Sequence, residues 1–154
     1  MTTTPWFVGI DVAKATLDLA VRPTGDALQV ANDDVGIAQV VTHLTALQPT
    51  LVALEATGGL EVPVAAALAA AGVPVVVLNP RQVRDFAKAV GRLAKTDGID
   101  AQVLAQFAET VRPDPRPLPD ADTQALGALV ARRRQVVEML TAERNRLAMV
   151  RPKP

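Results

Sequence analysis

The chain has 154 residues, of which 49% are hydrophobic and 3% aromatic, and its 16 basic and 16 acidic residues give a formal net charge of zero. A chain of this size can bury one core, and the absence of cysteine excludes disulfides, thiolate zinc sites and cysteine nucleophiles. The sequence shows no apolar stretch long enough to span a bilayer and no basic segment ahead of an apolar run at its start, so we expect a cytoplasmic protein that does not enter a membrane.

The charges are unevenly distributed along the chain. Residues 1–111 contain 7 basic and 11 acidic residues, whereas residues 112–154 contain 9 basic and 5 acidic residues. An acidic body followed by a basic arm is compatible with nucleic-acid binding through the arm. The competing interpretation is a solvated, charged helix face, which is the more common use of such a pattern.

The beginning of the chain predicts three strands and a helix. The apolar runs and alternations place the strands over Trp6–Val12, Thr16–Val21 and Ala27–Val30, and we expect them to form an antiparallel meander. Asn32 or Asp33 can cap the following helix, which ends before Pro49.

The next part alternates strands and helices. Continuous apolar runs are typical of strands buried on both faces, and they predict strands over Thr50–Glu55 and Val73–Leu78. Helical patterns cover Leu60–Ala71, Arg81–Val90 and Asp97–Val111.

A proline-rich segment divides the chain. Proline occupies positions 113, 115, 117 and 119, which predicts a stiff linker over residues 112–120 between a domain over residues 1–111 and a long helix within residues 121–154. The helix carries an apolar stripe that an isolated helix would leave in water, so we expect a homo-oligomer through residues 122–150, formed by a coiled-coil-like arm. The stripe consists of Leu126, Leu129, Val130, Val136, Val137, Leu140, Leu147 and Val150.

The order of elements predicts the fold class. Three strands, a helix, and then strand–helix–strand–helix is the order of an α/β, ribonuclease-H-like (RuvC-like) fold, a mixed sheet with flanking helices. In that fold the first and fourth strands are parallel neighbours, so Asp11 and Glu55 should lie side by side. Ligand sites in open α/β sheets lie beyond the carboxyl ends of such strands.

Four acidic residues stand out by their positions. Asp11 and Glu55 each close a buried strand, and Asp97 and Asp100 lie three apart at the start of a helical pattern. Neighbouring carboxylates would repel one another and lose hydration, and a hard divalent cation such as Mg²⁺ would relieve both effects. Taken singly, each has an ordinary alternative: a turn cap for Asp11, an exposed strand end for Glu55, and a helix cap or first-turn acid for the other two.

Several separated motifs resemble one family. They are Gly9-Ile10-Asp11-Val12-Ala13-Lys14, Glu55-Ala56-Thr57-Gly58-Gly59, Asn79-Pro80 and Lys95-Thr96-Asp97-Gly98-Ile99-Asp100-Ala101. In this order they look like the N-terminal, RuvC-like domain of the DEDD transposases of bacterial insertion sequences, the insertion sequence 110 family of RNA-guided "bridge" recombinases.

The resemblance implies a function. Asp11, Glu55, Asp97 and Asp100 would be the catalytic residues that coordinate Mg²⁺, with Mn²⁺ as a substitute, for DNA strand cleavage and exchange during transposition. The partners would be DNA and a structured guide RNA. Family members also carry a C-terminal domain with a nucleophilic serine, which we do not find before Pro154, so we expect a fragment without full recombinase activity.

Basic and polar residues near these motifs are candidates for binding nucleic acid, because cations neutralise phosphates. The candidates are Lys14, Thr57, Arg81, Arg84, Lys88, Arg92, Lys95, Arg132, Arg133 and Arg134. The alternative for the residues near the motifs is a solvated surface residue or a simple turn residue. For Arg132, Arg133 and Arg134, which lie on the long helix, it is a charged flank of a coiled coil. We expect Asp18 to be solvated on the polar face of its strand and His43 to be structural or exposed.

Two other functions remain open. The Gly9-Ile10-Asp11 segment also opens kinases and ATPases of the actin-like fold, but Ala13 stands where those enzymes want glycine, and nucleotide binding would discriminate. The domain could instead be a non-catalytic nucleic-acid-binding assembly module whose carboxylates bind metal only after a partner docks.

Overall fold

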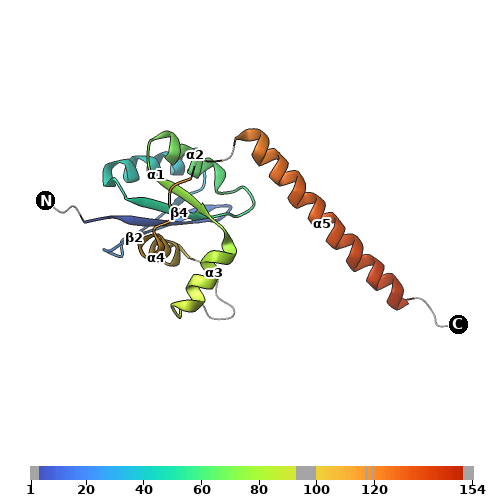
Figure 1. Cartoon of the computed structure of the whole chain (residues 1–154). Helices are drawn as coiled ribbons and strands as arrows, with labels where there is room; N and C mark the ends of the chain where they lie inside the picture. The colour runs from blue at the N-terminus through green and yellow to red at the C-terminus, as the bar shows by residue number, and fades with distance from the viewer. Residues whose placement is uncertain (1–3, 93–99, 117, 119, 151–154) are drawn as a thin grey trace. The chain divides into compact units, whose positions relative to one another are not determined.

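The computed structural model describes residues 4–92, 100–116, 118 and 120–150. The chain divides into two compact units, Met1–Leu118 and Pro119–Pro154, which we call the body and the arm. The elements are labelled in Figure 1. The division predicted from the sequence, into residues 1–111, 112–120 and 121–154, remains a proposal.

A five-stranded mixed sheet forms the centre of the body. Its strands are β1 (Phe7–Val12), β2 (Thr16–Arg22), β3 (Ala27–Ala31), β4 (Leu51–Glu55) and β5 (Val75–Leu78). The spatial order is β3-β2-β1-β4-β5. The first three strands form the predicted antiparallel meander, and β4 lies parallel to both β1 and β5. The predicted α/β fold with parallel first and fourth strands is therefore confirmed.

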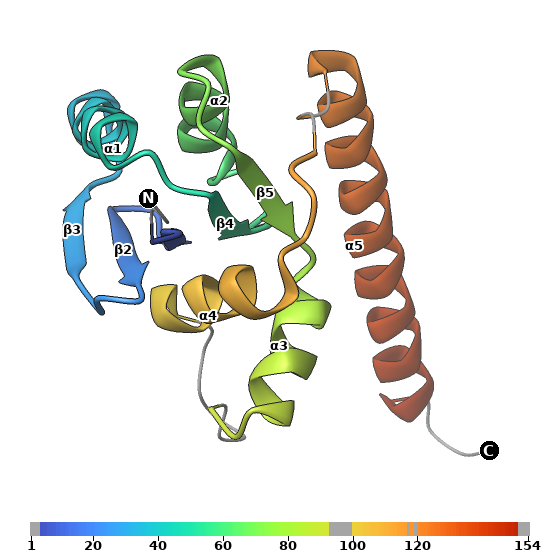
Figure 2. The same cartoon turned by 60° about the vertical axis from the view of Figure 1, so that its left-hand side comes forward.

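Helices cover both faces of this sheet, as Figure 2 shows. On one face, α1 (Asp34–Leu47) and α2 (Val62–Ala70) pack through residues such as Leu44 and Leu68. On the other face, α3 (Pro80–Ala89) and α4 (Ala101–Val111) pack through residues such as Val83 and Leu104. The apolar side chains of β1 and β4 alternate between these two cores, as the period of a strand requires.

Side-chain caps begin three of the helices. Asp33 Oδ1 accepts a hydrogen bond from the Gly36 N–H at 2.8 Å, Asn79 Oδ1 accepts from the Arg81 N–H at 2.9 Å, and Asp100 Oδ1 accepts from the Val103 N–H at 2.9 Å. Each cap satisfies a donor that the first turn leaves without an intrahelical partner. The start of α4 at Ala101 makes Asp100 the N-cap residue, whereas the sequence placed it within the first turn.

The boundary of α2 differs from the prediction. The helical pattern predicted a start at Leu60, but α2 begins at Val62. Gly58 and Gly59 adopt positive φ angles of 78° and 115°, and Glu61 folds back over this turn. The chain therefore makes a separate turn before the helix begins.

The contact between β1 and α4 is unusually close. A Cβ atom at Gly9 would lie 2.1 Å from the Ala101 carbonyl oxygen and 2.4 Å from the Ala105 nitrogen. Only glycine permits such an approach between a strand and the backbone of a helix. Ala20 on β2 extends this small-residue seam.

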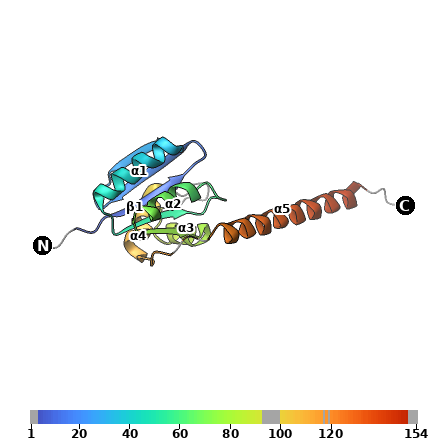
Figure 3. The same cartoon turned by 90° about the horizontal axis from the view of Figure 1, so that it is seen from above.

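The arm consists of one helix, α5 (Ala121–Val150), drawn as one uninterrupted helix in Figure 3. Asp120 directly precedes the helix, and its Oδ1 accepts a hydrogen bond from the Thr123 N–H at 2.7 Å. The apolar stripe named above is exposed along it, with Leu129 at 68% and Leu140 at 49% of full exposure. Within the residues that the structure describes, no helix combines the length and apolar character needed to cross a membrane.

Candidate functional site

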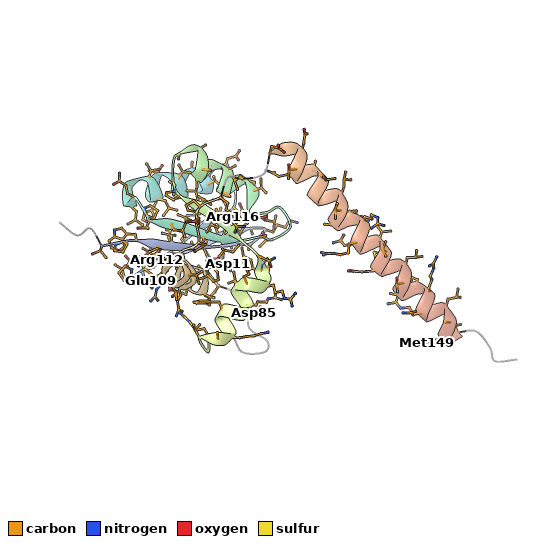
Figure 4. The ribbon with its side chains drawn as sticks, in the orientation of Figure 1. Asp11, Asp85, Glu109, Arg112, Arg116 and Met149 are labelled. Atoms are coloured by element: carbon orange, nitrogen blue, oxygen red, sulfur yellow. The ribbon has the colours of Figure 1, made fainter. Side chains whose placement is uncertain are left out.

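Asp11 and Glu55 lie on the same face of the sheet, at the carboxyl-terminal ends of the neighbouring strands β1 and β4. We call this end of the sheet the carboxylate edge. The pairing of Ile10 with Leu54 in the parallel β1–β4 ladder places the next residue of each strand side by side. Phe7 and Leu51 precede them on the same face, at even spacing, and belong to the core beneath α3 and α4. Asp11, which is labelled in Figure 4, and Glu55 are both half-buried. The sequence prediction of neighbouring carboxylates at this edge agrees with this arrangement.

The start of α4 brings a third acidic residue to Asp11. The Gly9 seam fixes the helix where Asp100, one residue before Ala101, adds negative charge near the end of β1. Burial raises the pKa of Asp11, and the charges of Asp18 and Asp100 raise it further. A raised pKa means that this environment disfavours the negative charge.

Glu55 has a similar environment with one opposing influence. Burial raises the pKa of Glu55, the Arg84 guanidinium lowers it, and the Asp11 charge raises it, so that the net direction is upward. The pairing of Glu55 with Leu78 explains the presence of Arg84, since α3 starts directly after β5 at this edge. Arg84 is thus the cation that the fold places beside the carboxylate pair.

Asp18 is an acidic residue of this edge that the sequence interpretation missed. It is the direct cross-strand partner of Asp11 in the β1–β2 ladder, and it is half-buried rather than solvated. Its Oδ1 accepts a hydrogen bond from Gln29 Nε2 at 2.6 Å. The alternation in β2 predicts that Asp18 lies on the face opposite to Leu17 and Leu19. Only the register of the hairpin shows that Asp11 lies on the same face as Asp18.

Glu61 is a second residue that sequence reasoning did not single out. It is 8% exposed, and it is the only polar or charged residue among those described that is buried. The glutamate follows a Thr-Gly-Gly turn at a spacing that lets its side chain reach back, which is a signal available in the sequence. The consequences of its hydrogen bonds are developed below.

The donor set of the edge suits a hard cation. Asp11, Glu55 and Asp100 supply carboxylate oxygens, which are the ligands that Mg²⁺ and Ca²⁺ prefer. Among the described residues, no group of three or more such side chains is already arranged to hold a metal ion. Asp97, the fourth predicted acidic residue, lies outside the described residues.

The predicted nucleic-acid-binding residues occupy varied positions. Lys14, Arg81, Arg84 and Lys88 are exposed on the β1–β2 turn and on α3. Arg92 donates a hydrogen bond to Gln106 at 2.8 Å, and Thr57 donates from both its N–H and its hydroxyl to Glu61. Arg132, Arg133 and Arg134 are exposed on α5, and Lys95 lies outside the described residues.

A shallow hollow along α1 contains none of the predicted site residues. It is lined by Asp34, Val35, Ala38, Gln39, Thr42 and His43. Because α1 covers the opposite face of the sheet from α4, this surface is separate from the carboxylate edge. His43 is exposed there, as the sequence suggested.

Solved structures share the fold of the body. RuvC from T. thermophilus, solved in complex with a Holliday junction substrate, is 20% identical with a TM-score of 0.50, and the match covers 73% of this chain and 100% of that chain. This likeness establishes the RuvC-like fold.

Two sugar kinases give weaker structural matches. An inorganic polyphosphate/ATP-glucomannokinase from Arthrobacter sp. strain KM is 18% identical with a TM-score of 0.42, and the match covers 62% of this chain and 52% of that one. A ROK hexokinase from Thermus thermophilus is 18% identical with a TM-score of 0.40, covering 60% and 39%. At these scores neither likeness supports a function for this chain.

The family comparison agrees with the fold. Among curated proteins, none matches the chain by sequence. A family model described as "Transposase", for DEDD transposases of the insertion sequence 110 type, matches residues 8–150, which include β1, β4, α4 and α5. The chain therefore belongs to the DEDD transposase family of insertion sequence 110.

Proposed function

We propose that the body supplies a binding site for a divalent cation, Mg²⁺ or its substitute Mn²⁺, at which DNA strands are cleaved and exchanged during transposition. One observation carries the proposal: Asp11, the last but one residue of β1, and Glu55, the last residue of β4, lie on the face of neighbouring parallel strands where α4 brings Asp100. Open α/β sheets bind their ligands at this kind of edge.

The chain's own residues have distinct roles in this proposal. Asp11, central in the sheet, and Glu55 would hold the cation from the strands, and Asp100 would complete the site from α4, together with Asp97. A bound divalent cation polarises the phosphoryl group and favours the attacking oxygen nucleophile. The strands and the α4 seam would keep these carboxylates near one another, and the side chains would close around the cation when it binds.

The electrostatics of the edge support cation binding. Burial and neighbouring negative charges raise the pKa values of both Asp11 and Glu55. A cation between such groups removes the repulsion and favours their ionised forms. Among the described residues, only Arg84 supplies a positive charge that acts on Glu55.

Nucleic acid is the proposed substrate and partner. Family membership supports DNA, and the RuvC structure of the same fold was solved with a Holliday junction. The exposed cations Lys14, Arg81 and Lys88 would neutralise phosphates near the site. The arginines of α5 would contact a structured guide RNA or DNA.

Cation binding can be measured on the full chain. Isothermal titration with Mn²⁺ should show a site that weakens strongly in Asp11→Asn, Glu55→Gln and Asp100→Asn. Asp34→Asn is the matched control, because Asp34 is an exposed acid on α1, over the opposite face. Equal affinity in all variants would contradict the proposal. Cation binding only after DNA is added would favour the assembly-module alternative.

We also propose that α5 associates with copies of itself. Leu126, Leu140 and Leu147 are spaced by multiples of seven residues and expose about half or more of their surface. Burying such a side chain is worth about 1.5–3 kcal/mol, and a seven-residue repeat is typical of coiled coils. Arg133 occupies the remaining position of the repeat, which would limit the number of helices that associate.

Sedimentation equilibrium tests this association. The full chain should be a dimer or higher oligomer, and the double variant Leu129→Lys/Leu140→Lys should be a monomer. Met149→Lys is the control, because Met149, labelled in Figure 4, is 85% exposed but does not belong to the stripe. A monomeric wild-type chain at micromolar concentration would contradict the proposal.

A further inference from the structure

The buried carboxylate of Glu61 is the charged group whose position the proposed chemistry leaves unexplained. Glu61 retains 8% of its exposure and directly precedes α2. Removing a carboxylate from water costs several kcal/mol unless hydrogen bonds replace the lost hydration. A residue that carries this cost is expected to have compensating partners.

Three hydrogen bonds converge on one oxygen of Glu61. Its Oε2 accepts from the Thr57 N–H at 3.0 Å, the Thr57 hydroxyl at 2.9 Å and the Gly59 N–H at 3.0 Å. Burial raises the pKa of Glu61, but hydrogen bonds from its own N–H and from Thr57 and Gly59 lower it more. The carboxylate is therefore ionised at neutral pH and satisfied within the protein.

These bonds fix the turn that leaves β4. Gly58 and Gly59 adopt left-handed φ angles, which glycine adopts without steric strain. The Ala56 N–H is also tied, because it donates to the Leu78 carbonyl of β5 at 3.0 Å. The two residues that follow Glu55 are thus both held by hydrogen bonds, Ala56 to β5 and Thr57 to Glu61.

The other end of this link is anchored in the core. Val64, Ala65 and Leu68 of α2 are fully buried against the sheet, so the helix is a fixed base for Glu61. A negative charge at this helix start is also favoured by the helix dipole. A continuous connection runs from the core through α2 and Glu61 to the turn, and from the turn to Glu55.

We propose that Glu61 is a positioning residue for Glu55: its buried carboxylate locks the Thr57–Gly59 turn and so holds the end of β4 in the orientation that places Glu55 beside Asp11. The proposal deepens the proposed function and rests on it, because the purpose of the orientation is to share a cation. Glu61 touches neither cation nor substrate in this role.

Two substitutions in the full chain test the role. Glu61→Ala removes all three hydrogen bonds, and Glu61→Gln keeps an oxygen that can accept them. We expect Glu61→Ala to weaken Mn²⁺ binding by about 10–100-fold, the usual loss when a group behind a metal ligand is removed. Glu61→Gln should recover most of that loss.

A stability control separates positioning from general unfolding. Leu44→Ala removes a fully buried side chain from α1 and should lower stability by about 2–5 kcal/mol without touching the turn. It should leave the Mn²⁺ affinity of the folded protein unchanged. Equal affinity losses in Leu44→Ala and Glu61→Ala, or an unchanged affinity in folded Glu61→Ala, would overturn the proposal. If Glu61→Ala does not fold, Thr57→Ala, which lacks only the hydroxyl donor, takes its place with a smaller expected loss.

Backbone NMR order parameters provide a readout without metal. At Glu55, Ala56 and Thr57 they should be about 0.85 in the wild type and fall toward 0.6 in Glu61→Ala, the values typical of rigid and flexible backbone. Unchanged order parameters would overturn the positioning role. If the wild type binds no Mn²⁺ while Glu61→Ala still loses order at these three residues, the positioning role stands and the proposed function is contradicted.

Discussion

Two glutamates six residues apart, at the two ends of the turn after β4, have opposite electrostatic environments. Burial raises the pKa of both Glu55 and Glu61. At Glu61, backbone and hydroxyl donors outweigh burial and lower the pKa. At Glu55, Arg84 offsets only part of the effect and Asp11 adds to it, so the pKa stays raised.

The difference indicates which carboxylate the fold has completed. Glu61 receives its donors from the chain itself and therefore serves the structure. Among the described residues, neither the Asp11 nor the Glu55 carboxylate receives a hydrogen bond, so the protein satisfies these two groups less completely than it satisfies Glu61.

The largest effect is expected from a substitution that displaces α4 and thereby removes Asp100 from the surroundings of Asp11. Gly9→Ala would push a methyl group against the Ala101 carbonyl oxygen, so stability should fall by about 3 kcal/mol and Asp100 should move away from Asp11. Urea unfolding measures the first effect, and NMR titration of Asp11 the second, as a smaller upward shift of its pKa. Gly127→Ala is the control, because its Cβ would meet nothing within 4 Å, and it should be neutral or stabilising.

The second effect is the stabilisation expected when a divalent cation binds to the carboxylates of Asp11 and Glu55. With Mg²⁺ or Mn²⁺ at 100 times its dissociation constant, the free energy of unfolding should rise by about 2.7 kcal/mol, since the cation binds only the folded state. Asp11→Asn and Glu55→Gln should lose this gain, and without metal they should be slightly more stable than the wild type because repulsion is removed. A cation effect of equal size in both variants would mean that the ion binds elsewhere.

The third effect uses pH to separate the two glutamates. The lowered pKa of Glu61 gives stability that is present above its ordinary value of 4.5 and is lost as pH falls through the folded value. The raised pKa values of Asp11 and Glu55 give stability that is present below 3.8 and 4.5 and is lost as pH rises through their folded values. Each group changes the stability by at most about 1.4 kcal/mol per pH unit.

The free energy of unfolding, measured from pH 3 to 7, should therefore respond differently in two variants. Glu61→Gln should remove the part that increases with pH, and Glu55→Gln should remove a part that decreases with pH. Identical pH profiles for the two variants would contradict the opposite environments.

The smallest expected effect concerns the pKa of Glu55 alone. Arg84→Gln should raise the pKa of Glu55 further, because it removes the cation that lowers it. The change should be small, because Arg84 is exposed, and it should disappear at about 1 M salt. Lys88→Gln on the same helix is the control, and an equal shift there would indicate a general charge effect.

The sequence by itself determined the elements and the place of the first carboxylate pair. The alternation in β2 and the continuous apolar runs in β1 and β4 are local signals, and the element order implies parallel neighbours. The sequence predicted that Asp11 and Glu55 would lie side by side on parallel neighbours, and the β1–β4 register places them on one face. The sequence offered Asn32 or Asp33 as the cap of α1, because a cap and its donor are a few residues apart, and the structure shows that Asp33 is the cap.

The tertiary structure shows that Asp18 also lies with these acids, how the predicted Asp100 reaches them, and that Glu61 is the carboxylate satisfied within the protein. Asp18 joins Asp11 through the register of a hairpin, and Asp100 reaches it because Gly9 lets α4 approach β1. Glu61 becomes a buried, ionised group because the left-handed turn aims the donors of Thr57 and Gly59 at one oxygen. Strand register and close packing depend on residues far apart in sequence, and donor direction depends on backbone angles. A local pattern of residue types therefore does not determine them.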